Sequence, residues 1–193
     1  MTDPTGSTDA SPAEIPGASS GTAGGPARGF TLRRTVAAPR DDVWAAWTDP
    51  DRLGWVAGDA RGVDRGLDAS IDLRVGGAWR VHLTEGEGSG RQYVTGGIYR
   101  HVEPHERLDF AWGAVGGWPE LDPEEGMAAL DAVPQVVVTF EDAHDGAGPI
   151  TVVTVTVGFA DAVPGEDVER WLALGIRAGW SDTLDRLPPS AAS

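Results

Sequence analysis

With 193 residues, 40% of them hydrophobic, and eight tryptophans, the chain is long and apolar enough for one domain with a full-sized core. Its formal net charge of −15 argues against a surface that neutralises nucleic-acid phosphates, and the lack of cysteine excludes disulfides, a thiolate nucleophile and cysteine-type zinc sites. The sequence shows no signal peptide, and no apolar run approaches the ~18 residues of a membrane span. We therefore expect a cytoplasmic protein that does not cross a membrane.

The first 29 residues consist almost entirely of Thr, Gly, Ser, Ala, Pro and Asp. A segment of this composition buries too little apolar surface to offset the entropy of ordering it. The composition therefore predicts a disordered tail over 1–29 and a single domain over 30–188.

The domain opens with a predicted strand at 30–36, where apolar and polar residues alternate. Pro39 and the acidic pair after it predict a helix that ends at Asp49-Pro50, and a second short helix or turn follows at 51–56. About six further strands follow at hairpin spacing. The predicted strands are 69–75, 77–83, 91–102, 107–112, 134–142 and 149–160. In the third of these, Gly96-Gly97 indicates a bulge or a close approach of another segment.

The segment 165–187 has apolar residues at spacings of three and four, which predicts one helix longer than ~30 Å. Its inward face carries Gly175 and Gly179, and each lowers helix propensity by about 1 kcal/mol relative to Ala. Either a neighbour packs closely at these glycines, or they leave room for a molecule held between helix and sheet. The order of elements predicts an α+β fold in which a curved antiparallel sheet grips the long C-terminal helix.

Motifs along nearly the whole predicted domain carry a family resemblance. The first set is Ala38-Pro39, Val43-Trp44, Ala46, Thr48-Asp49-Pro50, Leu53 and Trp55. The second set is Asp72, Arg74, Gly76-Gly77, Trp79, Gly97, Val102, Pro104, Glu106-Arg107-Leu108, Phe110, Gly179-Trp180, Leu184 and Leu187. In these residues the chain resembles the START-like (Bet v1-like) helix-grip domains of the SRPBCC superfamily, in the branch named after the activator of Hsp90 ATPase. The resemblance implies the helix-grip fold.

Within this fold the chain resembles the self-sacrifice resistance proteins for enediynes such as calicheamicin. That resemblance implies that the enediyne binds in the helix-grip cavity, and that its activated diradical takes a hydrogen atom from a glycine backbone instead of from DNA. The donor is expected at Gly113, directly after the strand 107–112, because a glycine Cα radical is delocalised onto both flanking peptide groups. The residues expected to contact the ligand are Trp112, Trp118, Gly116, Gly117, Trp171, Gly175 and Gly179.

Other candidate sites have plainer interpretations. The tryptophans are numerous for core filling alone, and their large rigid rings suit an aryl ligand, although core packing explains any single one. The histidines, which are His82, His101, His105 and His144, lack metal-ligand spacing and are expected at strand ends or on the surface. The acidic residues Glu120, Asp122, Glu124 and Glu125 are expected on a solvated loop, with contact to a cationic amino sugar as the alternative. The sequence predicts no metal and no organic cofactor.

Three functions compete at this point. They are a stoichiometric resistance protein that is not an enzyme, a polyketide cyclase or aromatase that uses an Arg or His in the cavity, and a module that stimulates a chaperone ATPase. A protein that only binds a hydrophobic small molecule is a further alternative to the first. The chain shows no obvious acid–base pair and no second chaperone-binding segment, which favours the first function. We expect a monomer that binds no membrane and no nucleic acid strongly.

Overall fold

The computed structural model of the chain describes residues 28–57, 68–85, 91–121, 127–144, 146 and 148–187. The predicted tail lies outside the described residues as far as Ala27, and so do the acidic residues Asp122, Glu124 and Glu125. Gly29 already belongs to the first strand, one residue before the predicted start of the domain. The preceding Arg28 donates hydrogen bonds from Nη2 to the carbonyls of Ala160 and Val163, both at 2.8 Å.

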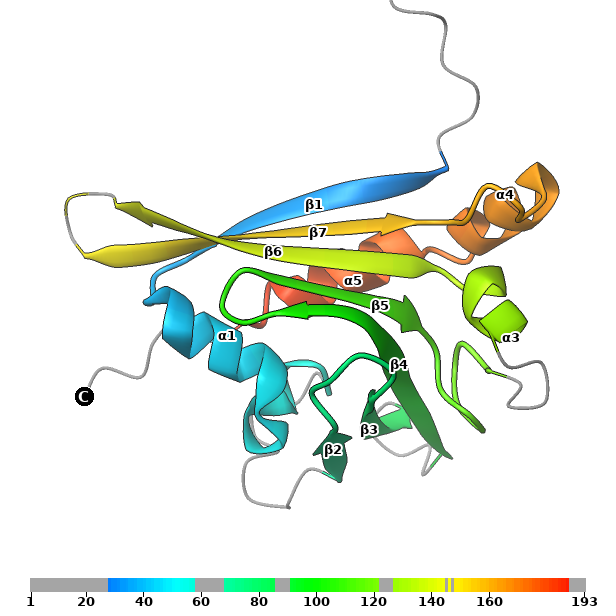
Figure 1. Cartoon of the computed structure of the whole chain (residues 1–193), viewed down its shortest axis with the longest axis horizontal. Helices are drawn as coiled ribbons and strands as arrows, with labels where there is room; N and C mark the ends of the chain where they lie inside the picture. Colours follow the sequence, from blue (N-terminus) through cyan, green and yellow to red (C-terminus); the bar gives the residue numbers. More distant parts are fainter. Residues whose placement is uncertain are drawn as a thin grey trace, which may run out of the picture.

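A seven-stranded antiparallel sheet forms the body of the domain, in the order β1-β7-β6-β5-β4-β3-β2 (Figure 1). The strands are β1 (Gly29–Val36), β2 (Ala69–Ile71), β3 (Ala78–Glu85), β4 (Arg91–Glu103), β5 (Arg107–Trp112), β6 (Gln135–His144) and β7 (Pro149–Gly158). The first strand pairs with the last, so that β1 and β7 run side by side from Gly29 opposite Gly158 to Val36 opposite Thr151. This pairing brings the start of the domain next to the segment that leads into the C-terminal helices.

Helices lie at both ends of the sheet and along one face. They are α1 (Arg40–Thr48), the 3-10 helix η1 (Pro50–Trp55), α3 (Met127–Ala132), α4 (Gly165–Ala173) and α5 (Ile176–Leu184). Figure 1 shows α1 at one end of the sheet, α3 and α4 at the opposite end, and α5 along the sheet. The buried residues of α5 belong to the same apolar cluster as residues of the sheet, which confirms the predicted α+β helix-grip architecture.

The predicted single C-terminal helix is wrong in one respect, because the segment folds as two helices. Gly175 has φ +78°, in the left-handed region, and separates α4 from α5. A left-handed residue after the last turn is the usual way for a helix to end, and glycine adopts it without steric cost. The apolar periodicity continues across the break, which is why the sequence pattern alone indicates one helix.

One strand prediction is wrong, and the prediction for the glycines of β4 is confirmed in one of its two forms. The strand predicted over 69–75 ends at Ile71, and the chain then turns until β3 begins at Ala78. At Gly97 an added Cβ would lie 2.5 Å from Trp79 Nε1, which confirms the predicted close approach. The irregularity in the pairing of β4 with β5 lies between Tyr99 and His101 and not at the glycines.

Candidate functional site

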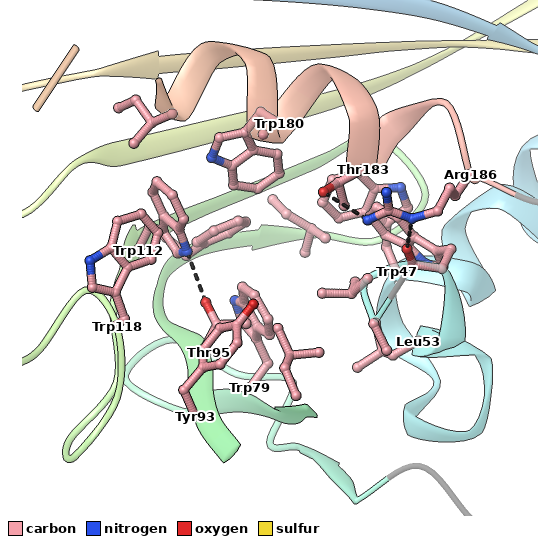
Figure 2. Close-up of a pocket in the computed structure, with 18 of the residues that line it drawn as sticks. Trp47, Leu53, Trp79, Tyr93, Thr95, Trp112, Trp118, Trp180, Thr183 and Arg186 are labelled. Atoms are coloured by element: carbon pink, nitrogen blue, oxygen red, sulfur yellow. Dashed lines mark hydrogen bonds between the residues drawn. The ribbon is translucent and has the colours of Figure 1, made fainter. Parts of the chain in front are cut away.

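A cavity of about 330 Å³ lies between α5 and the concave face of the sheet (Figure 2). The sheet contributes mostly aromatic walls, and α5, η1 and the turn before α5 close the other sides. The lining residues are Trp47, Leu53, Trp55, Val56, Ala57, Trp79, Leu83, Tyr93, Thr95, Tyr99, Leu108, Phe110, Trp112, Trp118, Leu174, Gly175, Ile176, Gly179, Trp180, Thr183 and Arg186. Six of the eight tryptophans of the chain are in this set.

Strand periodicity explains which sheet residues reach the cavity. Successive side chains of a strand point to opposite faces, so every second residue shares one face. In β5 this places Leu108, Phe110 and Trp112 on the cavity face, and in β4 it places Tyr93 and Thr95 there. The sheet therefore builds the wall from a pattern that is already visible in the sequence.

Three exposed apolar residues mark the mouth of the cavity. Tyr93 on β4, Trp118 on the loop after β5 and Leu174 at the break between α4 and α5 are 40%, 42% and 61% exposed. Because these three residues border one cavity, its rim is apolar and half-open, which suits the entry of a hydrophobic ligand.

The two helix glycines face open space. Gly175 and Gly179 both line the cavity, and a Cβ added at either would meet no atom within 4 Å among the described residues. Close packing against the sheet therefore does not explain these glycines. Gly175 is explained by its left-handed backbone, and Gly179 leaves open space where it borders the cavity.

The loop after β5 folds back tightly. Gly113 N–H donates to the Gly96 carbonyl at 2.9 Å, Ala114 N–H to the Pro119 carbonyl at 2.8 Å, and Trp118 N–H to the Val94 carbonyl at 2.7 Å. The peptide bond between Trp118 and Pro119 is cis. The segment 113–121 is thus held by backbone hydrogen bonds on the edge of the cavity.

Gly113 is buried. Of its two Cα hydrogens, the one that stands where other residues carry a Cβ points away from the cavity. A Cβ there would lie 2.9 Å from Leu121 Cγ and 3.0 Å from the Pro119 carbonyl oxygen. Since Trp112 takes the cavity face of β5, the next residue takes the opposite face. Gly113 therefore neighbours a cavity residue in the chain without lining the cavity itself.

The other predicted contact residues divide between the rim and the surface. Gly116 occupies an exposed turn with φ +67°, and Gly117 packs beneath it against Ala114. Trp171 on α4 is outside the cavity lining, although its ring centroid lies 6.2 Å from that of Trp118. Of the predicted contacts, the cavity itself collects Trp112, Trp118, Gly175 and Gly179.

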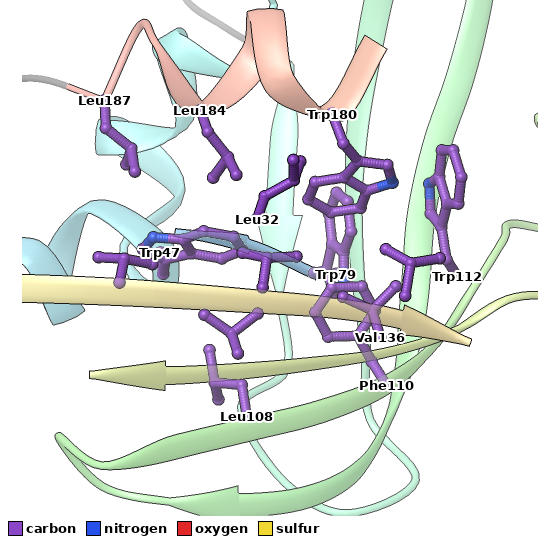
Figure 3. Packing of buried hydrophobic residues seen from close by; sticks show 14 of the residues in the cluster. Leu32, Trp47, Trp79, Leu108, Phe110, Trp112, Val136, Trp180, Leu184 and Leu187 are labelled. Carbon is purple, nitrogen blue, oxygen red and sulfur yellow. The ribbon is translucent and has the colours of Figure 1, made fainter. Parts of the chain in front are cut away.

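The base of the cavity continues into the apolar core. Figure 3 shows Trp180, Leu184 and Leu187 reaching from the C-terminal segment toward Leu108 and Phe110 on the sheet. The rings of Trp112 and Trp180 meet edge to face with centroids 5.3 Å apart, the preferred arrangement for aromatic pairs. These contacts fix the aromatic walls before any ligand binds.

Polar side chains around the cavity are few. Trp112 Nε1 donates to Thr95 Oγ1 at 3.1 Å, and both residues are buried. The buried indole N–H groups of Trp47, Trp79 and Trp180 have no hydrogen-bond acceptor among the described residues. Burial raises the pKa of Tyr99 above its ordinary value, so its phenol is neutral at physiological pH.

Arg186 is the cation at one end of the cavity. Its Nε donates to the Trp55 carbonyl at 2.9 Å, Nη1 to the Asp182 carbonyl at 2.9 Å, and Nη2 to Thr183 Oγ1 at 3.1 Å. Figure 2 shows Arg186 and Thr183 on the side opposite Trp112 and Trp118. The cavity therefore carries its charge at the end beside Trp47 and Trp55, while Trp112 and Trp118 lie at the other end.

The histidines lie outside the cavity lining. His82, His101 and His105 approach the carboxylates of Asp68, Glu103 and Asp41, respectively. All three have half-exposed side chains, and His144 is exposed, as the sequence predicts for strand-end and surface positions. In the described part of the chain, no three His, Asp or Glu side chains are grouped to hold a metal ion.

None of the described helices is both long and apolar enough to cross a bilayer.

Comparison with known families agrees with this geometry. The family described as Activator of Hsp90 ATPase homolog 1-like protein matches residues 37–189, which is most of the chain and nearly all of the described domain. The chain belongs to this family. No curated protein matches the sequence significantly.

Solved structures show how widely this family fold is shared. Protein Ms6760 from Mycobacterium smegmatis is 22% identical, with a TM-score of 0.57 over 83% of this chain and 88% of that one. A protein from Arthrobacter aurescens is 18% identical, with a TM-score of 0.59 over 83% of both chains. DynU16, described as a putative protein in the dynemicin biosynthetic locus, is 27% identical, with a TM-score of 0.51 over 84% of this chain and 46% of DynU16.

Several residues that line the cavity were not predicted as ligand contacts from the sequence. Tyr93, Thr95, Tyr99 and Phe110 could have been found by extending the alternation in the predicted strands to one shared face. Arg186 had no comparable signal, because its place beside η1 depends on how α5 crosses the sheet.

Proposed function

We propose that this protein protects against an enediyne by binding it in the cavity and quenching its activated diradical with hydrogen from a backbone glycine. Each radical centre takes one hydrogen atom, so that a new C–H bond forms and a glycine Cα–H bond breaks. The glycine Cα radical then adds dioxygen, and breakdown of the resulting peroxyl species cleaves the backbone. The protein is consumed in the process, which makes it a stoichiometric agent and not an enzyme.

The observation that carries the proposal is an aromatic cavity with an open rim and with glycines beside open space. Large rigid rings suit a polycyclic or aryl-bearing ligand, and binding makes hydrogen transfer effectively intramolecular. Among the described residues that line the cavity, none is Asp, Glu, His or Lys, and of the Arg or His expected for a polyketide cyclase only Arg186 lies there, which favours binding over acid–base catalysis. The similarity to DynU16 adds an enediyne context, since that protein is described as belonging to the dynemicin locus.

Two positions are candidates for the hydrogen donor. The resemblance to the calicheamicin resistance protein CalC implies Gly113, of whose two Cα hydrogens the one in the Cβ position points at Leu121. Gly179 lines the cavity, as does Gly175 at the rim. Within the proposal, Gly113 is the donor implied by the family, and Gly179 is the alternative donor because it lines the cavity.

Mapping the cut tests the proposal. The full chain is incubated with a thiol-activated enediyne in air, and the fragments are identified by mass spectrometry. We expect one dominant backbone cut, at Gly113 or at the 175–179 segment, together with transfer of deuterium from labelled glycine Cα to the reduced aromatic product. An intact chain, or a product without deuterium, would overturn the proposal.

A further inference from the structure

We propose that the cavity selects ligands that carry an anionic or strongly hydrogen-bond-accepting oxygen at the end that contacts Arg186. This inference rests on the proposed function and adds the chemistry of the ligand that the site accepts. It also disfavours a cationic group inside the cavity, such as the amino sugar considered from the acidic loop.

Among the described residues of the lining, Arg186 is the one charged side chain. The hydroxyl oxygens of Thr95 and Thr183 already accept hydrogen bonds from Trp112 and Arg186. The indole N–H groups of Trp47, Trp79 and Trp180 lack acceptors among the described residues, but their nitrogens are covered by protein atoms and do not reach a molecule in the cavity. The selection of the ligand therefore rests on the guanidinium of Arg186.

Arg186 brings a positive charge that the described cavity does not neutralise. Its hydrogen bonds go to the Trp55 carbonyl, the Asp182 carbonyl and the Thr183 hydroxyl, all of them neutral acceptors. Other arginines of the domain pair with carboxylates, as Arg34 does with Asp185 at 2.6 Å and Arg100 with Asp131 at 2.6 Å. No described carboxylate forms such a pair with Arg186, and its guanidinium has more N–H donors than these contacts use.

The placement of this charge also matters. The protein as a whole has a net charge of −15, so a general electrostatic attraction would favour cations and not anions. A preference for an anion therefore has to come from the local guanidinium. Charge-assisted hydrogen bonds are about twice as strong as neutral ones, and they act at close range in a partly dehydrated site.

Three naphthalene probes of similar size test the inference. They are 2-naphthoate, 2-naphthamide and 2-naphthylmethylammonium, titrated by calorimetry against the full chain at neutral pH and physiological salt. We expect 2-naphthoate to bind about tenfold more tightly than the amide and the ammonium to bind most weakly. The advantage of the carboxylate should disappear in Arg186→Gln and persist in Arg186→Lys.

Arg177→Gln is the matched control, because it removes the same charge from α5, the helix that directly precedes the turn with Arg186. Arg177 is exposed, lies 5.9 Å from the Phe30 ring centroid, and is not part of the cavity lining. The order of the three affinities should be unchanged in this variant. The melting temperature of each variant is measured first, and Arg186→Met, which also removes the charge but keeps an apolar stem, serves if Arg186→Gln does not fold.

The results separate this inference from the proposed function. Equal binding of the three probes to the unaltered protein, or a carboxylate preference that survives in Arg186→Gln, would overturn the selection of anions and leave the cavity as a binding site. A failure of all three probes to bind, when heat is recorded up to millimolar concentrations, would count against the cavity as a binding site and hence against both proposals.

Discussion

Replacing Gly179 with leucine places an apolar side chain in the space between α5 and the sheet. Gly179 is exposed and borders the cavity, and a Cβ there meets no described atom within 4 Å, so the substitution enters open space and not packed core. Leucine improves helix propensity over glycine by about 0.8 kcal/mol, and partial burial of its side chain adds roughly 1 kcal/mol at ~25 cal/mol per Å². For a domain of this size, about 2 kcal/mol corresponds to a rise in melting temperature of roughly 4–8 °C.

The affinity for a ligand should fall in this variant, whereas its stability should rise. Adding methylene groups to a site that must also hold a ligand costs about 1–3 kcal/mol, which corresponds to an affinity loss of roughly tenfold or more. The neutral probe N-phenyl-1-naphthylamine becomes fluorescent in apolar sites, and its titration gives the affinity of each variant. Ala178→Leu is the control, because Ala178 is an exposed neighbour on α5 outside the cavity lining.

A stable Gly179→Leu variant with unchanged affinity would refute the reasoning, since the ligand would then lie elsewhere. A strongly destabilised variant would also refute it, because the space beside α5 would then be occupied. An equal loss of affinity in Ala178→Leu would show that the effect is not specific to the cavity.

Three further predictions concern stability. Gly113→Ala should lower the free energy of unfolding by about 1–3 kcal/mol in denaturant titration, because its Cβ would lie 2.9 Å from Leu121 Cγ. Gly54→Ala is the control and should leave the free energy of unfolding unchanged, because its Cβ would meet nothing within 4 Å. Since burial raises the pKa of Tyr99 above 10.0, stability should be unaffected by this group below pH ~10 and fall above it by up to about 1.4 kcal/mol per pH unit, a loss absent from Tyr99→Phe. Arg28→Ala removes two hydrogen bonds to carbonyls and should cost about 1–3 kcal/mol, while deletion of residues 1–27 should leave the melting temperature within a few degrees. A large drop in the deletion variant would contradict the interpretation of that segment as a tail.

Local patterns in the sequence account for most of the fold. The alternation in β1, β6 and β7 and the Pro39 start of α1 predict these elements within a few residues, because strand and helix periodicity follow from backbone geometry alone. The same alternation determines that Trp112 and Gly113 face opposite sides of β5. The placement of Gly113 away from the cavity was therefore predictable from the alternation. The family resemblance instead pointed to Gly113 because it directly follows Trp112 in the chain.

The tertiary structure decided the remaining features. Apolar spacing runs unbroken through 165–187, so the break at Gly175 is visible only in its left-handed backbone, which the spacing of side chains does not encode. Arg186 becomes a cavity residue because α5 crosses the sheet beside η1 and brings its guanidinium to the Trp55 carbonyl, 131 residues away in sequence. The sequence by itself determined which face of each strand is apolar. The site depends on how distant elements pack against one another, because local residue patterns do not specify contacts between segments that are far apart in the sequence.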